Sequence, residues 1–323
     1  MVKTNKVENM GNLQYNILIL KTLKNEIFNI KGGSSIMVKI ISDSTCDLSK
    51  ELIEKYDIDT FPLLVTFGEE SYKDGVEIDA NKIYEEVKKR GYLPKTSAVS
   101  ALEIEEVFRK YIDQGYEIVY TGISSKMSST YNNACLAAKE VAEDKIFVVD
   151  SKNLSTGISL LLLKGCMDRD RGLSAKEIAE NMTKLADKVK SQFAIETMEY
   201  LHKGGRCSSI ARFAATVLRI KPIIFVRDGT LSVGKKPLGK MTVALNAMLK
   251  MLEEDKAKNN VDPEFIFVTD AIAPESREYL LPKVKELFPN TNVYATTAGG
   301  VIASHCGYGT IGILYICKED VHL

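Results

Sequence analysis

The chain has 323 residues, 45% of them hydrophobic and 27% charged, and its 43 basic residues balance its 43 acidic ones. This length predicts about two domains with sizeable hydrophobic cores. The balanced charge and the lack of a dense Lys/Arg run argue against a nucleic-acid partner bound through its phosphates, and no apolar run approaches the about 20 residues of a membrane-spanning helix.

Cysteine and histidine are sparse in this sequence. Its six cysteines include no C-x-x-C pair, which favours reduced thiols in a cytoplasmic protein over a disulfide framework. With three histidines and no metal-ligand spacing, the sequence predicts neither a metal site nor a cofactor.

The residues before Met37 differ in character from those that follow. Met37 leads directly into a buried strand, and the triplet at 31–33, Lys-Gly-Gly, is what a purine-rich ribosome-binding site would encode. We therefore interpret residues 1–36 as a non-native or disordered extension, with native translation starting at Met37. The alternative is a native extension without fixed structure.

The first half alternates strand-like and helix-like segments. Helix starts are indicated by Asp47 or Ser49, by Asp79, and by Ser100 with Glu103 in a capping-box pattern. Predicted strands lie at 39–43, 60–67, 117–123 and 145–150. One predicted helix ends near residue 56, and the others span 82–89, 101–114, 129–142, 157–168 and 174–190. Such alternation predicts βαβ units around a mostly parallel sheet.

The second half predicts an α+β arrangement with a mixed sheet. The pair Asp228-Gly229 between two apolar runs is a strong hairpin signal. Predicted strands lie at 192–196, 223–226, 231–233, 264–270, 292–296 and 312–317, and predicted helices at 241–255 and 274–288. The polar segment 167–174 predicts the domain boundary, which gives domains at 37–170 and 171–321.

Several predicted turns of the first half are rich in hydroxyl groups. They lie at 42–45, 95–97, 124–130 and 150–152, and most follow the carboxyl end of a predicted strand. Ligands bind at that edge of an open α/β sheet, and hydroxyls with free helix N–H groups suit an anionic head group. The alternative for each cluster is ordinary helix and turn capping.

Two segments of the second half carry further candidates. Arg206 follows Gly204 and Gly205 and offers a fork for a carboxylate or phosphate, although a tight turn with a surface arginine has the same pattern. His305 lies in a predicted glycine-rich loop, where it could bind a ligand or have a structural role.

Catalytic motifs are mostly absent. Ser128, His305 and Asp43 are the residue types of a catalytic triad, but the sequence has no G-x-S-x-G elbow and no Walker pattern. The segment 307–312 matches G-x-G-x-x-G, yet it leads into a predicted strand, which argues against a dinucleotide site.

Taken in order, these segments resemble the DegV family of bacterial fatty-acid-binding proteins. The resemblance covers most of residues 37–318 and rests on the combined order and spacing of several short motifs. They are SDSTCDL at 42–48, KTSAVS at 95–100, SSKMSSTY at 124–131, VDSK at 149–152, YLHKGGR at 200–206, KP at 221–222 and SHCGYG at 304–309.

The resemblance implies a two-domain fold with an apolar tunnel for one long-chain fatty acid and its carboxylate at the domain junction. On the family pattern, Thr96 and Ser128 bond the carboxylate, Ser97 is an adjacent candidate, and Arg206 and His305 are the basic residues beside it. The resemblance further implies a non-catalytic carrier that presents the acid to a separate ATP-dependent fatty acid kinase, for acyl-phosphate formation and phospholipid synthesis. It also allows a transient contact with a membrane surface.

The sequence departs from the family pattern around the head group. Lys126 and Ser129 stand where glycine is usual, Ala98-Val99 replaces Gln-Pro, and Cys207 replaces an aliphatic residue. Side chains at two usual glycine positions predict that the segment 124–131 leaves less space for the ligand head group. Two alternatives to the carrier stay open here: a serine acyl-hydrolase or acyltransferase that uses Ser128 and His305, and a regulatory module whose lipid only fills the structure.

Overall fold

The computed structural model describes residues 37–207 and 220–321. The first half of this part folds around a four-stranded parallel sheet with the strand order β2-β1-β6-β7. Its strands are β1 (Met37–Asp43), β2 (Ile58–Phe61), β6 (Tyr116–Gly122) and β7 (Ile146–Asp150). The expected extension at 1–36 lies outside the described residues and stays a prediction.

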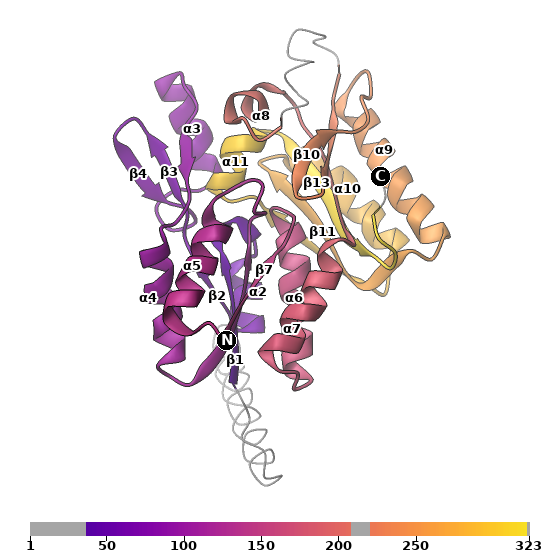
Figure 1. Cartoon of the computed structure of the whole chain (residues 1–323). Helices are drawn as coiled ribbons and strands as arrows, with labels where there is room; N and C mark the ends of the chain where they lie inside the picture. The colour runs from indigo at the N-terminus through magenta and orange to yellow at the C-terminus, as the bar shows by residue number, and fades with distance from the viewer. Residues whose placement is uncertain (1–36, 208–219, 322–323) are drawn as a thin grey trace, which may run out of the picture. The chain divides into compact units, whose positions relative to one another are not determined.

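Helices cover both faces of the parallel sheet (Figure 1). On β6, Ile118 and Tyr120 join one core cluster and Val119 joins the other, because successive side chains of a strand point to opposite faces. The helices on the Tyr120 face are α4 (Ala101–Ile112) and α5 (Thr130–Ala142), and those on the Val119 face are α6 (Thr156–Asp170) and α7 (Ala175–Ala186).

The strand predicted at 60–67 is wrong as a single element. Pro62, which lacks an N–H group, separates β2 from β3 (Leu64–Phe67), and the two belong to different sheets. β3 is the middle strand of a three-stranded antiparallel sheet with β4 (Glu70–Lys73) and β5 (Lys95–Ser97). Neither of these short strands was predicted.

The predicted helix caps of the first half are confirmed. The side chain of Ser49 caps α2 (Lys50–Tyr56), Asp79 caps α3 (Ala80–Arg90), and Ser100 with Glu103 forms the capping box of α4. Asp47 instead lies at the end of a short 3-10 helix, η1 (Ser44–Cys46).

The second half forms the predicted mixed sheet, with the strand order β10-β9-β8-β13-β11-β12. β11 and β12 are parallel and the other neighbours are antiparallel. The hairpin turn is confirmed, with Asp228 at φ 46° and Gly229 at φ 75°. The strands are β8 (Val189–Ala194), β9 (Ile223–Arg227), β10 (Thr230–Val233), β11 (Val261–Ala271), β12 (Asn292–Thr297) and β13 (Thr310–Cys317).

Among the described residues of the second half, two long and two short helices accompany this sheet. The predicted long helices are confirmed as α9 (Met241–Ala257) and α10 (Pro274–Leu287). Two short helices, α8 (Glu199–Gly204) and α11 (Gly300–Cys306), were not predicted, and α11 lies where a glycine-rich loop was expected. The helix predicted to end at Lys190 ends at Ala186, because the chain turns there into β8.

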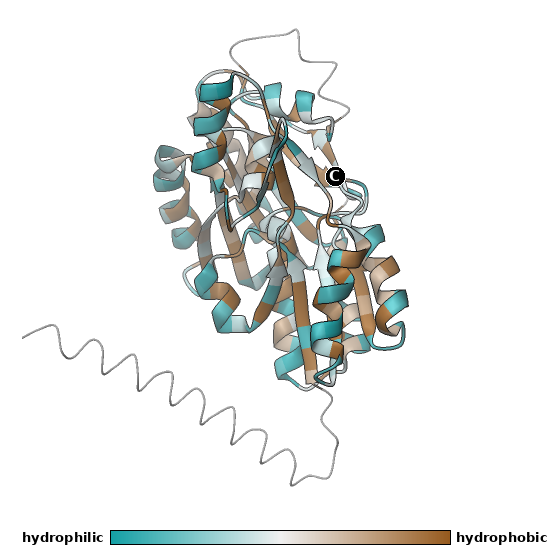
Figure 2. Ribbon diagram, turned by 90° about the vertical axis from the view of Figure 1, so that its left-hand side faces the viewer, coloured by the Kyte–Doolittle hydropathy of each residue, from teal (hydrophilic) through white to brown (hydrophobic). Residues whose placement is uncertain are grey.

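Helix α6 connects the two halves. Its residues are buried nearly all round, and it contacts strands of both the parallel and the mixed sheet, which explains why its sequence lacks a polar face. Figure 2 shows the same pattern, with hydrophobic residues gathered in the strands and polar residues on the outer helices. The boundary between 170 and 171 stays a prediction.

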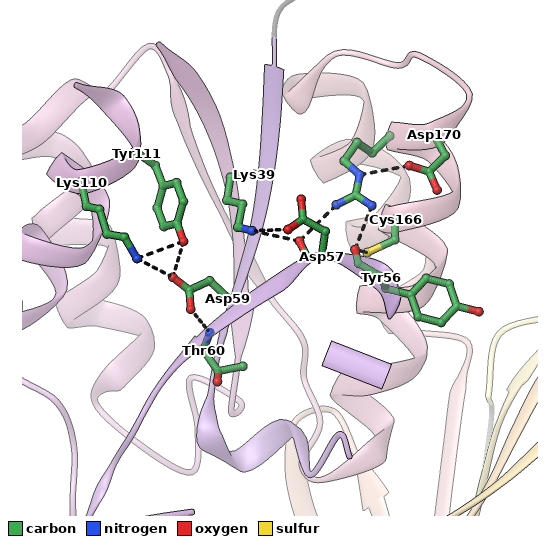
Figure 3. Close-up of polar contacts among 10 residues, drawn as sticks. Lys39, Tyr56, Asp57, Asp59, Thr60, Lys110, Tyr111, Cys166 and Asp170 are labelled. Atoms are coloured by element: carbon green, nitrogen blue, oxygen red, sulfur yellow. Dashed lines mark hydrogen bonds and ion pairs between the residues drawn. The ribbon is translucent and has the colours of Figure 1, made fainter. Parts of the chain in front are cut away.

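A polar cluster fixes the start of β2 at the amino ends of the parallel strands (Figure 3). Lys39 Nζ lies 3.0 Å from Asp57 Oδ1, and Arg169 Nη2 donates to the carbonyl of Tyr56 at 2.8 Å. Asp59 accepts a hydrogen bond from the hydroxyl of Tyr111. Each charged group of this cluster therefore has a partner.

Candidate functional site

A cavity of about 320 Å³, lined by both polar and apolar side chains and called the polar cavity below, lies at the carboxyl ends of the parallel strands. This volume is at the lower end of the range for small-molecule sites. All five residues predicted for the site line it: Thr96, Ser97, Ser128, Arg206 and His305. They come from β5, from the loop after β6, from the segment after α8 and from α11, so distant parts of the chain converge on one cavity.

Thr96 and His305 form the central polar contact of the cavity. The hydroxyl Oγ1 of Thr96 lies 2.8 Å from Nε2 of His305. Thr96 is fixed by the pairing of β5 with β3, and His305 lies in the last turn of α11. The expectation that His305 occupies a loop is therefore wrong, and the helix gives its side chain a defined direction.

The electrostatic environment keeps His305 uncharged at neutral pH. Burial of the ring, which disfavours the imidazolium ion, and the nearby positive charge of Arg206 lower the pKa of His305 from 6.5 to about 4. Among the described residues its Nδ1 atom is buried without a hydrogen-bond partner. Of the two basic residues that were predicted for the site, Arg206 and not His305 therefore supplies positive charge beside the cavity.

Two buried aspartates from the first half hold the start of α11. Asp47 accepts a hydrogen bond from Gly299 N at 2.8 Å, and Asp74 accepts one from Gly300 N at 2.6 Å. Burial raises the pKa of Asp74 to about 6 and that of Asp47 well above its usual range. These contacts connect the helix that carries His305 to the first half. Sequence reasoning missed them, because Asp47 was considered only as a helix cap and Asp74 lies in none of the motifs.

The loop that carries Ser128 is held by contacts with both halves. The buried hydroxyl of Ser124 donates to the carbonyl of Gly229 at 2.8 Å, at the tip of the β9–β10 hairpin. Ser128 Oγ lies 2.9 Å from Thr130 Oγ1, at the start of α5. Lys126 and Ser129, the two departures from the family pattern, also line the cavity.

Glycine is required where α8 approaches α11. A Cβ atom on Gly204 would lie 2.4 Å from His305 Nδ1, so only glycine allows this close contact. Gly205 ends α8 in the left-handed region at φ +69°. Arg206 follows directly and is exposed, with Nη1 donating to the carbonyl of Gly204 at 2.7 Å.

The hydroxyl-rich turns do not all converge on the cavity. The turns at 95–97 and 124–130 contribute lining residues, whereas those at 42–45 and 150–152 do not. The hydroxyl of Ser42 instead donates to the carbonyl of Thr121, and that of Ser44 donates to Asp74. In the turn at 150–152, the hydroxyl of Ser151 donates to the carbonyl of Asn153. The hydroxyls of these two turns therefore bond within the protein and not in the cavity.

The residues weighed as a catalytic triad are not assembled as one. Asp43 accepts hydrogen bonds from Thr45, Tyr120 and Ile123 N, all within its own domain. The hydrogen bond of Ser128 is with Thr130, and His305 Nε2 contacts Thr96. The serine–histidine–aspartate chain of hydrogen bonds that activates a nucleophile is therefore not present among these residues.

A second, apolar cavity adjoins the polar one. It measures about 50 Å³, and its lining includes Phe193, Leu201 and Leu314. Leu154, Leu231, Ile302 and His305 line both cavities, so the two share a wall. At this volume the apolar cavity is not the long tunnel that the resemblance implies, so the tunnel stays a prediction.

Residues 37–207 and 220–321 offer neither a metal-ligand cluster nor a helix that could span a membrane. This part of the chain contains no group of three or more His, Cys, Asp or Glu side chains arranged to hold a metal ion. None of its helices is both long enough and apolar enough to cross a membrane.

The fold and the two adjoining cavities define a two-domain α/β protein with a polar pocket against an apolar one. The family model described as "Uncharacterised protein, DegV family" matches residues 37–318. A DegV domain-containing protein from Clostridium perfringens is 34% identical over 281 residues, which cover 86% of this chain and 98% of that protein. The chain belongs to the DegV family, as its sequence motifs predicted.

Solved structures agree with this assignment. The crystal structure of DegV from Bacillus subtilis, a fatty acid binding protein, is similar with a TM-score of 0.79 and 26% identity, and the match covers 88% of this chain and 100% of that one. A stearic acid-binding protein from Eubacterium ventriosum is similar with a TM-score of 0.77 and 30% identity, covering 87% and 99%. The predicted two-domain fold is thereby confirmed.

Proposed function

We propose that this protein binds one long-chain fatty acid, with the carboxylate in the polar cavity and the chain directed into the apolar one. The observation that carries the proposal is that the hydroxyls of Thr96 and Ser128 line one cavity with Arg206, directly against an apolar cavity. The fatty acids bound by the Bacillus and Eubacterium proteins support the same ligand class.

The energetics of such a ligand are favourable. Burying about fourteen methylene groups at about 0.8 kcal/mol each contributes roughly 11 kcal/mol, before the costs of association and of widening the apolar cavity. An unpaired buried carboxylate would cost several kcal/mol, so the head group needs donors. Thr96, Ser97 and Ser128 supply hydroxyl donors, and Arg206 supplies positive charge.

His305 acts in this proposal as a positioning residue for Thr96. An orphaned N–H group is less common in protein interiors than an orphaned acceptor, which favours the tautomer with the proton on Nε2 and a bare Nδ1. Nε2–H then donates to Thr96 Oγ1, and the hydroxyl proton of Thr96 is left to bond the carboxylate. A neutral histidine therefore orients a donor without adding charge.

We further propose that the protein is a cytoplasmic carrier and not an enzyme. On the family pattern it presents the bound acid to a separate ATP-dependent fatty acid kinase, which forms the acyl phosphate, and it contacts a membrane surface transiently. The dispersed hydrogen bonds of Ser128, His305 and Asp43 support a carrier over a serine hydrolase. The test of this part is exchange of labelled oleate together with kinase-dependent phosphorylation.

Organic extraction of the purified full-length protein, followed by mass spectrometry, tests the ligand class. We expect about one fatty acid per chain, released only when the protein is denatured. Recovery of a different class of small molecule, or of no lipid after incubation with oleate, would contradict the proposal.

A fluorophosphonate probe tests the hydrolase alternative on the same preparation. We expect no covalent labelling, because among residues 37–207 and 220–321 Ser128 has no hydrogen-bonded base. Stoichiometric labelling of Ser128 would show that the protein is a serine enzyme.

A further inference from the structure

An open groove runs along one edge of the parallel sheet, apart from both cavities described above. It measures about 530 Å³, and one of its sides is β7 from Ile146 to Val149. The other side is α7, whose lining residues recur at the spacing of a single helix face. They are Lys176, Ala179, Glu180, Thr183 and Lys184.

The β7 side of the groove offers main-chain hydrogen-bonding groups. Ile118 N donates to Lys145 O, and in the parallel ladder Ile118 pairs with Ile146. Because main-chain groups of successive residues point to opposite sides of a strand, Ile146 and Val148 direct theirs away from β6. β7 is the last strand of its sheet, so within the described part of the chain no strand pairs with these groups. The edge is therefore open to one more strand.

This edge lacks the features that usually protect an open strand. Natural proteins block such edges with a charged side chain, a proline or a β-bulge. The segment from 146 to 149 reads Ile-Phe-Val-Val, and its pairing with β6 is regular. Phe147 and Val148 are only partly buried. An unprotected apolar edge of this kind is a template for pairing with an extended chain.

The α7 side of the groove determines which charges suit a partner. Lys176, Glu180 and Lys184 are exposed and form no ion pair among the described residues. The two lysines are eight residues apart, which corresponds to about 12 Å along a helix. Residues four apart in an extended strand share a face and are separated by about 13 Å. Between the lysines, the small side chain of Ala179 leaves room for an apolar group.

We infer that this groove binds an extended peptide segment of a partner protein, which adds to the sheet beside β7. The segment places two acidic side chains, four residues apart, against Lys176 and Lys184, with an apolar side chain between them over Ala179. Main-chain hydrogen bonds to Ile146 and Val148 supply affinity, and the alternate side chains supply specificity. The inference goes beyond the proposed function, because the groove shares no lining residue with the polar or the apolar cavity.

A second copy of this chain fits the groove less well than a peptide. Pairing of two β7 strands about a twofold axis would bring the two α7 helices onto the same face of the joined sheet. Each helix carries two lysines and one glutamate along the groove, so the positive charges would repel each other.

Three synthetic peptides test the inference on the full-length protein by fluorescence anisotropy. The first is fluorescein-labelled Ser-Asp-Thr-Val-Thr-Asp-Ser, the second has lysine in place of aspartate, and the third has proline at the three central positions. We expect the aspartate peptide to bind at least about fivefold more tightly than the lysine peptide, the size of effect of two exposed ion pairs. The proline peptide should not bind, because proline has no N–H group to donate.

Variants assign the binding to the two sides of the groove. Val148→Pro removes an N–H that points away from β6 and should weaken binding of the aspartate peptide at least about tenfold. Val148→Thr keeps that N–H and is the matched control, with affinity within twofold of the wild-type value. Lys176→Glu/Lys184→Glu should invert the preference, so that the lysine peptide binds more tightly. Circular dichroism shows whether each variant folds.

Several results would overturn the inference. Equal affinity for the aspartate and proline peptides would show that no strand pairs with β7, and an unchanged preference in Lys176→Glu/Lys184→Glu would exclude α7. A dimer that light scattering detects in the wild-type protein and not in folded Val148→Pro would show that a second copy occupies the groove. Absence of aspartate-peptide binding at about 1 mM would also overturn it. If Val148→Pro does not fold, the charge variant decides: an inverted preference supports the inference and an unchanged one overturns it.

Discussion

The two ends of the parallel sheet differ in whether their charged side chains are paired within the protein. At the amino ends of the strands, Lys39 pairs with Asp57, and Arg169 donates to the main chain at the start of β2 (Figure 3). At the carboxyl ends, Lys126 and Arg206 line a cavity whose described lining contains no carboxylate. Both ends are polar, but the amino end satisfies its charges internally.

This difference separates structural from binding residues. A charge paired within the protein stabilises one local conformation, and removing it leaves a partner unsatisfied. A cation held beside a cavity without a partner adds little to folding but attracts an anionic ligand. Removing charge at the carboxyl ends should therefore change affinity, and removing it at the amino ends should change stability.

The largest effect is expected for Arg206→Met. Loss of a charge-assisted hydrogen bond to a carboxylate should weaken fatty-acid binding by about tenfold or more, equivalent to about 1.5–3 kcal/mol. Because Arg206 is exposed, the free energy of unfolding of the protein should change by less than about 0.5 kcal/mol. Titration with fluorescent oleate measures the affinity, and urea denaturation measures the free energy of unfolding. Unchanged affinity would show that Arg206 is not a binding residue.

Lys39→Met is the matched change at the other end. The Lys39 side chain is 9% exposed and Asp57 is 56% exposed, so the pair is partly screened by solvent. We expect a loss of about 1 kcal/mol in the free energy of unfolding, with oleate affinity unchanged. A drop in affinity without a loss of stability would show that the two ends are not separate in function.

A third effect concerns the protonation of His305. Its folded-state pKa of about 4 lies below its ordinary 6.5, so the folded protein binds fewer protons between these values. The stability that His305 contributes should therefore be lost as the pH falls from 6.5 to 4. In Arg206→Met the pKa should rise, because the repelling charge is gone, yet stay below 6.5 because the ring is still buried.

Imidazole NMR signals measure that shift directly. The ligand-free wild-type protein should show a His305 midpoint near 4. A midpoint near 6.5 in the wild-type protein would contradict the buried, neutral histidine on which the positioning of Thr96 depends.

Local chemistry explains which parts of the fold were predictable. Capping by Asp79 and Ser100 and the turn at Asp228-Gly229 depend on neighbouring residues, and all were predicted. The break at Pro62 was overlooked inside an apolar run. Helix α11 was missed because glycines surround it, and its stability comes from tertiary contacts with Asp47 and Asp74.

The site was predictable only in part. The order of the motifs selected Thr96, Ser128, Arg206 and His305, and the structure brings these four to one cavity. Their spacing alone carries no such information, because they come from distant segments. The neutral state of His305 depends on burial and on Arg206, which a sequence does not display.

The central claim is that hydroxyl groups from separate segments hold a fatty-acid carboxylate. The most direct test is the lipid content of the double variant Thr96→Ala/Ser128→Ala, measured by extraction and mass spectrometry beside the wild-type protein. We predict that the variant stays folded and retains almost no fatty acid. A folded variant with the same lipid content as the wild-type protein would contradict the claim.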